Sequence, residues 1–78
     1  MNAVRKTLTN LVKLRGVQAS EIQDYNFRLY FVRRANEDLE AIEKNTDLEV
    51  TDEMIKQAEK DVKQMERMKV VQNSIYIV

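Results

Sequence analysis

The sequence has no cysteine and no histidine, and these two absences exclude most of the chemistry that small proteins carry. Without Cys there can be no disulfide, and without Cys or His the usual ligands of zinc, copper and iron are missing. Catalysis by a nucleophile and a proton acceptor also lacks its ordinary components. We therefore expect no catalytic residue and no metal site, and we interpret the chain as a protein that is not an enzyme.

Proline is also absent and there is one glycine, so the residues that form tight turns between strands are missing. The 78 residues are 44% hydrophobic and 33% charged, a composition that favours helices. A chain this short buries only about 60 to 65% of its unfolded surface, so its stability alone is expected to be marginal. Association with another molecule is the remaining means of stabilisation for a chain without disulfides or metal.

The 13 basic and 13 acidic residues cancel, but they are distributed unevenly. Residues 1–20 contain basic residues and no acid. In residues 36–53 every charged residue is acidic apart from Lys44. The zero net charge argues against a nucleic-acid partner. No apolar run approaches the ~20 residues that cross a bilayer. The basic, amphipathic start is typical of a mitochondrial targeting segment, and it is equally compatible with an ordinary first helix.

Hydrophobic periodicity predicts a single three-helix domain over residues 1–78, with helices at about residues 2–16, 24–44 and 52–72. The first helix is expected to end near Gly16, the only glycine. The β-branched residues from Val70 to Val78 predict an irregular C-terminal tail. The predicted fold is thus an all-α three-helix bundle with an irregular tail.

Local signals mark where the second and third helices begin. Asp24 and Ser20 are rival N-caps for the second helix, because Ser20 and Gln23 also have the spacing of a capping box. Thr51, followed by two acids, is the expected N-cap of the third helix.

The second helix carries more apolar surface than one core-facing stripe requires. Its main stripe consists of Phe27, Phe31, Ala35, Leu39 and Ile42, and further apolar residues on its other sides are Tyr25, Leu29, Tyr30 and Val32. Either this helix is central and contacts both neighbours, or one of its faces binds another protein. Arg33 and Arg34 precede Glu37 and Asp38 by four residues, which allows ion pairs along the helix; binding to an acidic partner is the other interpretation.

The second helix also carries the run Tyr25-Asn-Phe-Arg-Leu-Tyr-Phe-Val-Arg-Arg34. This run closely resembles the Tyr-Asn-Tyr-Arg-x-Tyr-x-Val-Arg-Arg signature of the LYR-motif accessory subunits of mitochondrial cysteine desulfurase, which act in iron–sulfur cluster assembly. The resemblance extends without gaps from about Arg5 to Arg67, and Ala58-Glu-Lys-Asp-Val62 is similar to the family's Ala-Lys-Arg-Asp-Leu. It implies an LYR-type bundle.

In this register the family's Leu-Tyr-Arg triplet falls on Leu11, Val12 and Lys13, so the tyrosine is lost. The resemblance implies that an acyl carrier protein meets this region and that its acyl-phosphopantetheine arm enters the bundle as a structural ligand, with no cofactor bound covalently. The residues expected to dock the acidic carrier are Arg5, Lys6, Lys13 and Lys44. Those expected to line the core and the acyl chain are Leu8, Val12, Phe27, Phe31, Ala35, Leu39, Ile55, Ala58, Val62 and Met65. Candidates for contact with other partners are Tyr25, Leu29, Tyr30, Val32, Arg33, Arg34, Arg67 and the Val70 to Val78 tail.

The resulting hypothesis is a non-catalytic accessory subunit that binds and stabilises a cysteine desulfurase and recruits acylated carrier protein. The expected location is the mitochondrial matrix or a mitochondrion-derived organelle, where scaffold and other cluster-assembly proteins are met through the desulfurase. Three alternatives stay open. They are an LYR-type assembly factor for a respiratory complex, a membrane-surface protein whose basic first helix lies on anionic lipid, and a self-associating helical bundle.

Overall fold

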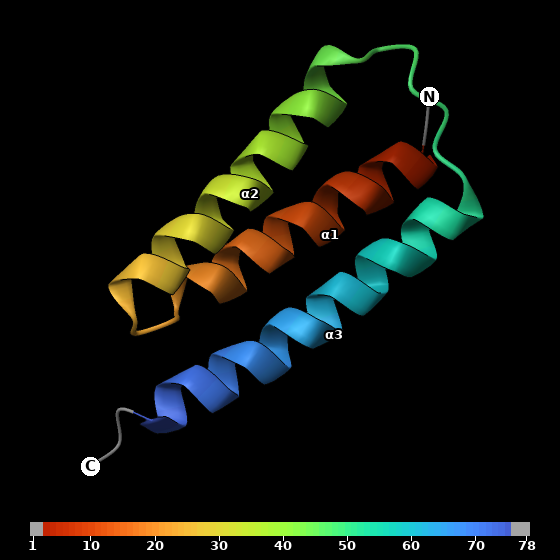
Figure 1. Ribbon diagram of the computed structural model, residues 1–78. Helices are drawn as coiled ribbons and strands as arrows, with labels where there is room; N and C mark the ends of the chain where they lie inside the picture. Colours follow the sequence, from red (N-terminus) through yellow and green to blue (C-terminus); the bar gives the residue numbers. More distant parts are fainter. Residues whose placement is uncertain (1–2, 76–78) are drawn as a thin grey trace.

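The computed structural model describes residues 3–75, which form three helices and no strand (Figure 1). The helices are α1 (Ala3–Ser20), α2 (Tyr25–Lys44) and α3 (Asp52–Ile75). The predicted all-α class with three packed helices is therefore confirmed. Position 2, where the first helix was expected to begin, and tail residues 76–78 lie outside the described residues. No helix within the described range has the length and apolar content needed to span a bilayer.

Side-chain caps set the starts of α2 and α3. The Asp24 carboxylate accepts the backbone amide of Phe27 at 3.1 Å, so Asp24 rather than Ser20 is the N-cap of α2. The Ser20 hydroxyl instead donates to the Val17 carbonyl at 2.6 Å. At α3 the Thr51 hydroxyl accepts the amide of Met54 at 3.2 Å. Both caps satisfy amides that have no partner inside the first helical turn.

The first helix was predicted to end near Gly16, but it continues to Ser20. No residue in the described part, glycine included, has a positive φ, so Gly16 does not terminate the helix in the left-handed conformation. Its role is close approach: a Cβ at Gly16 would lie 3.3 Å from the Cβ of Ala35 on α2. Glycine here lets α1 and α2 pack at short distance.

The third helix also runs further than predicted, to Ile75, so the segment from Val70 to Ile75 is helical and not an irregular tail. Its last turns are fixed to the connection between α1 and α2. The Asn73 side chain donates to the Glu21 carbonyl at 3.0 Å and accepts the Gln23 amide at 2.9 Å. These bonds explain why a β-branched segment stays helical, because tertiary contacts outweigh weak local preference.

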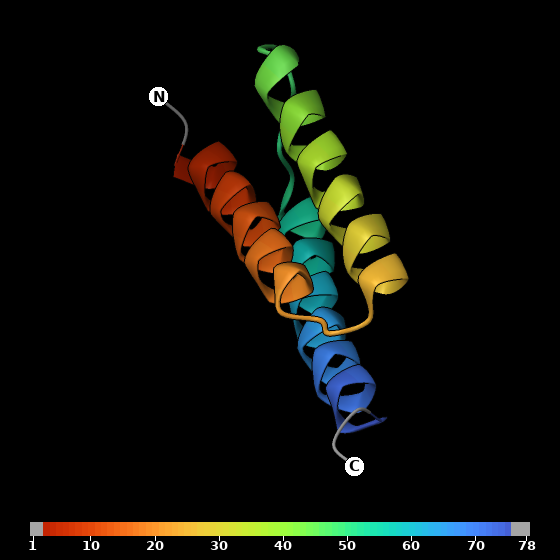
Figure 2. The ribbon, with the colours of Figure 1, turned by 90° about the vertical axis from the view of Figure 1, so that its left-hand side faces the viewer.

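In the view of Figure 1, α1 lies between α2 and α3, and the side view shows α3 behind the space between α1 and α2 (Figure 2). The backbone of α1 approaches both other helices closely, whereas the backbones of α2 and α3 stay further apart in the described structure, although both helices contribute side chains to the core clusters. The central helix is thus α1, and the interpretation of α2 as the central helix is wrong. The molecule measures 48 × 20 × 14 Å, which leaves much of α2 and α3 exposed.

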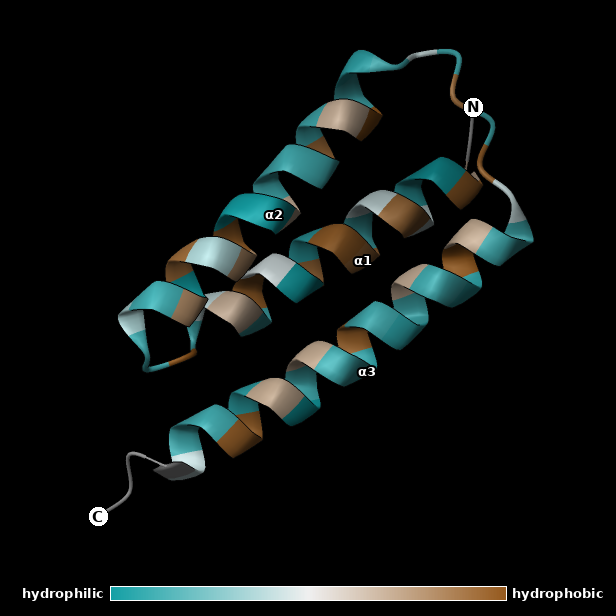
Figure 3. Ribbon diagram, in the orientation of Figure 1, coloured by the Kyte–Doolittle hydropathy of each residue, from teal (hydrophilic) through white to brown (hydrophobic). Residues whose placement is uncertain are grey.

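Two clusters form the core, and apolar residues recur along all three helices between hydrophilic ones (Figure 3). The first cluster consists of the buried residues Leu8, Val12, Ile42 and Ala58. The second consists of Ala19, Ile22 and Met65, with Phe31 and Val32 packed against it. Ile22 is the only large side chain among the described residues with no exposed surface, although it lies in the connection and not in a helix.

Candidate partner-binding surfaces

The four cations predicted to dock a carrier protein do not form one patch. The Arg5 guanidinium donates to the carbonyl of Ile42 near the end of α2 and so helps to hold α1 against α2. Lys44 pairs with Glu40 at 2.9 Å on the surface of α2. Lys6 and Lys13 are exposed on α1, and neither forms an ion pair with any described residue. Three of the four are therefore exposed, and of these Lys6 and Lys13 carry no ion pair within the described residues.

The triplet Leu11, Val12 and Lys13 lies at a groove between α1 and α2. Leu11 packs against the first core cluster, Val12 is buried and Lys13 is exposed at the groove's edge. The groove has a volume of about 400 Å³, and its lining residues are Val12, Lys13, Gly16, Val17, Ser20, Val32, Ala35, Asn36 and Leu39. A mostly apolar groove with a cation at its edge is suited to an apolar chain with an anionic attachment.

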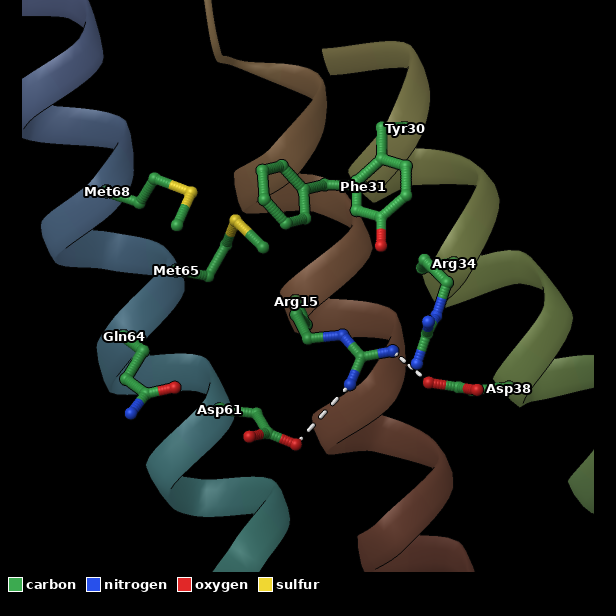
Figure 4. Close-up of a pocket in the computed structure, with 9 residues that line it drawn as sticks. All are labelled: Arg15, Tyr30, Phe31, Arg34, Asp38, Asp61, Gln64, Met65 and Met68. Atoms are coloured by element: carbon green, nitrogen blue, oxygen red, sulfur yellow. Dashed lines mark hydrogen bonds and ion pairs between the residues drawn. The ribbon is translucent and has the colours of Figure 1, made fainter. Parts of the chain in front are cut away.

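A second hollow, of about 260 Å³, lies between α2 and α3, whose backbones do not approach each other closely (Figure 4). Its apolar wall is formed by Tyr30, Phe31, Met65 and Met68. At its other end Arg15, on α1, hydrogen-bonds Asp38 of α2 and lies 3.5 Å from a carboxylate oxygen of Asp61 on α3 (Figure 4). Arg15 is therefore an ionic link from the central helix to both others.

The residues predicted to line the core and the acyl chain are divided among several places. Val12, Ala35 and Leu39 line the α1–α2 groove, and Phe31 and Met65 line the α2–α3 hollow. Leu8 and Ala58 belong to the first core cluster and Ile55 packs against it, while Val62 is half-buried and Phe27 is exposed. The periodic stripes identified inward faces, but the structure does not bring them together into one tunnel.

Beside Val4, Leu14 and Val17 on α1, six exposed apolar residues lie toward one end of the molecule, where α2 begins and α3 ends (Figure 1). They are Tyr25, Phe27, Leu29 and Tyr30 on α2 and Val70 and Val71 on α3. Tyr25 is 63% exposed, with the Arg28 guanidinium 5.6 Å from its ring centroid. By contrast Val32, another predicted contact residue, packs against the second core cluster. We call the six exposed residues the apolar end.

The opposite end of the molecule is acidic. It contains the end of α2, the loop to α3 and the first turn of α3, with exposed carboxylates at Glu40, Glu43, Asp47, Glu49, Asp52 and Glu53. Helix α1 also begins there (Figure 1), so the basic start of the chain lies beside the acidic segment and does not form a separate basic end. The predicted Arg33–Glu37 and Arg34–Asp38 pairs are absent from the described structure, and Asp38 pairs with Arg15 instead. Arg33, Arg34 and Arg67 are exposed.

Sequence reasoning missed an ionic contact that joins α3 to the connection between α1 and α2. The Lys69 ammonium lies 2.9 Å from Glu66 and 3.0 Å from Glu21. Hydrogen bonds to Glu66 and to Glu21 raise the pKa of Lys69 above its usual value of 10.5. The three-residue spacing of Glu66 and Lys69 could have predicted their ion pair. The contact with Glu21 could not be predicted in this way, because Glu21 is far away in the sequence.

Comparison with known proteins gives one match. The family model described as "ISD11 family" matches residues 1–78, the whole chain. No curated protein and no solved structure matches.

Proposed function

We propose that this chain, which belongs to the ISD11 family, binds and stabilises a cysteine desulfurase while holding an acylated carrier protein. Members of the family are non-catalytic partners of cysteine desulfurase in iron–sulfur cluster assembly. The resemblance carried by the second helix is thereby confirmed over the whole chain. Catalysis belongs to the desulfurase, and this chain contributes binding.

The apolar end is the observation that carries the desulfurase part of the proposal. It places six exposed apolar side chains from α2 and α3 at one end of a small molecule whose other end is acidic. Tyr25 and Tyr30 supply large, partly apolar contact surfaces of the kind enriched in protein interfaces. Covering these residues removes apolar area from water at about 25 cal/mol per Å². A protein partner is therefore the expected occupant of this end.

The α1–α2 groove supports the carrier part of the proposal. Lys6 and Lys13 are accessible to an acidic carrier, and Lys13 stands at the edge of the apolar groove. Lysine binds a phosphate as a point charge, without the two-pronged geometry of arginine. An acyl chain lying in the groove gains about 0.8 kcal/mol for each methylene removed from water. The acyl-phosphopantetheine is then a structural ligand that completes the packing of α1 on α2.

The location follows from the family. Because ISD11 proteins are typically mitochondrial, we expect the chain in the mitochondrial matrix or in a mitochondrion-derived organelle. Scaffold and other cluster-assembly proteins are reached through the desulfurase. The alternative in which α1 lies on a membrane cannot use Leu8 and Val12, which are buried in the core, and leaves Val4, Leu14 and Val17 as the exposed apolar residues of that helix.

The test is intact-complex mass spectrometry of the tagged chain purified from its own cells. We expect a cysteine desulfurase and a carrier bearing an acyl-phosphopantetheine mass. The double variant Lys6→Glu, Lys13→Glu is expected to lose the carrier and keep the desulfurase. If the wild-type chain is recovered alone or as a homo-oligomer, the proposal is contradicted. If the Lys6→Glu, Lys13→Glu variant keeps the carrier, the carrier-binding surface does not lie on α1.

A further inference from the structure

A row of four cations runs along the outward face of α3. The residues are Lys56, Lys60, Lys63 and Arg67, spaced by four, three and four positions, and all four are exposed. This spacing places them on one helical face over a length of about 16 Å. Ala58 and Met65, which are buried against the rest of the bundle, lie two positions from members of the row and so on the opposite side. We call these four residues the α3 ridge.

The stability of the helix does not account for two residues of the ridge, Lys60 and Arg67. None of its four residues forms an ion pair within residues 3–75. Lys60 and Arg67 have no acidic residue three or four positions away on either side. They have like charges there instead, at Lys56 and Lys63. Lys56 and Lys63 do have an acid at this spacing, since Glu59 lies three positions after Lys56 and four before Lys63. Because like charges at this spacing weaken a helix, Lys60 and Arg67 are the two ridge residues that are unfavourable in the isolated chain.

The surroundings of the ridge favour a protein over a lipid surface. Glu59 and Glu66 are exposed on its flank, so the cationic surface is narrow and would bring acids toward an anionic membrane. One turn beyond Arg67 stand Val70 and Val71, both exposed. A line of cations that ends in an apolar pair matches a protein interface with an apolar centre and a charged rim.

The position of the ridge leaves the other proposed surfaces accessible. The ridge faces away from α1, whereas the groove for the carrier lies between α1 and α2, and the backbones of α2 and α3 stay apart. Val70 and Val71 follow the ridge by one helical turn and are part of the apolar end. The ridge is therefore continuous with the proposed desulfurase surface and separate from the carrier surface.

We propose that the α3 ridge docks an acidic surface of the cysteine desulfurase, with Val70 and Val71 as the adjoining apolar contact; this rests on the proposed function. The cations steer the encounter and fix the register of α3 on its partner, as complementary charges do in other complexes. The complex is consequently expected to weaken as salt rises, because exposed charges are screened.

The experiment uses the complex co-expressed and purified through a tag on this chain. The ridge variant is Lys60→Gln, Arg67→Gln, since glutamine keeps helix propensity and removes the like-charge contacts. The matched control is Lys6→Gln, Lys13→Gln, which also removes two positive charges. We expect the ridge variant to keep wild-type helicity, bind desulfurase about tenfold more weakly at low salt, and approach the wild type at high salt. Carrier recovery per desulfurase bound should be unchanged, and the control should show the reverse pattern.

Other outcomes overturn the assignment of the ridge. Unchanged desulfurase affinity in the ridge variant excludes the ridge from the interface, and loss of the carrier in its place assigns the ridge to the carrier. Binding of the wild-type complex to phosphatidylcholine vesicles that contain phosphatidylserine, if lost in the ridge variant, assigns the ridge to lipid. If the wild-type chain recovers no desulfurase at all, the proposed function itself fails, a result distinct from any change confined to the variant.

Discussion

Replacing Ile22 by alanine is expected to destabilise the free chain more than any other single truncation in its second core cluster. Ile22 has 0% exposure and packs with Ala19 and Met65. Truncating a buried Ile to Ala typically costs about 2 to 5 kcal/mol of unfolding free energy, so we expect about 3. A domain of this length has roughly 4 to 12 kcal/mol of total stability, so the loss is a large fraction of it.

The assay is urea unfolding followed by far-ultraviolet circular dichroism. The truncation should lower the urea midpoint without changing the slope, because it changes stability and not the area exposed on unfolding. Ile22→Val is the graded comparison, expected to cost about 1 kcal/mol. Val17→Ala, at a position that is 57% exposed, is the surface control and should cost about 0.5 kcal/mol or less.

Equal losses for Ile22→Ala and Val17→Ala would refute this reasoning. They would mean that the connection between α1 and α2 does not close the second core cluster. The hydrogen bonds of the connection support the view that it covers the second core cluster. Arg28 on α2 donates to the carbonyls of Ile22 and Gln23 at 3.0 and 3.3 Å, and these bonds hold the connection in place.

Two further changes test the ionic contacts between helices. Arg15→Met should lower the unfolding free energy by about 1 to 3 kcal/mol, since Arg15 is only 14% exposed and its loss leaves two carboxylates without their shared cation; an unchanged thermal midpoint would contradict its linking role. For Lys69 the folded-state pKa is raised, so its stabilisation is fully present below the usual 10.5 and is lost as pH rises through the raised value. The difference in urea midpoint between the wild type and Lys69→Met should therefore shrink at alkaline pH, and a difference that does not depend on pH would exclude this linkage.

Local signals in the sequence predicted the helices well, and long-range contacts explain the exceptions. Asp24 and Thr51 cap their helices as their types and positions suggest, because an N-cap depends only on the next three residues. Gly16 was misread as a helix stop, since its close approach to Ala35 depends on a second helix. Ile22 was overlooked because it is a lone apolar residue in a polar connection, with no periodic pattern to mark it.

The surfaces were less predictable than the helices for the same reason. Periodicity tells which side of a helix is apolar, but not which neighbour covers that side. Nothing in the sequence places α1 in the centre, and this placement decides that Leu8 is buried while Tyr25 is exposed. The use of Arg5 and Arg15 inside the fold was equally hidden, because their partners are Ile42, Asp38 and Asp61, far away in the sequence.

The separation of α2 from α3 links the fold to its function. Because the backbones of the outer helices approach only the central one closely, the bundle has fewer contacts to lose when it unfolds, so its stability depends on what binds it. A partner present at 100 times its Kd stabilises the folded chain by about 2.7 kcal/mol, nearly the loss expected for Ile22→Ala. Binding of a partner can therefore offset most of the loss expected from truncating one core side chain. Because only the folded chain binds desulfurase, the folded fraction of the chain determines how much desulfurase is bound. Mutual stabilisation is then a direct consequence of a bundle that is incompletely packed by itself.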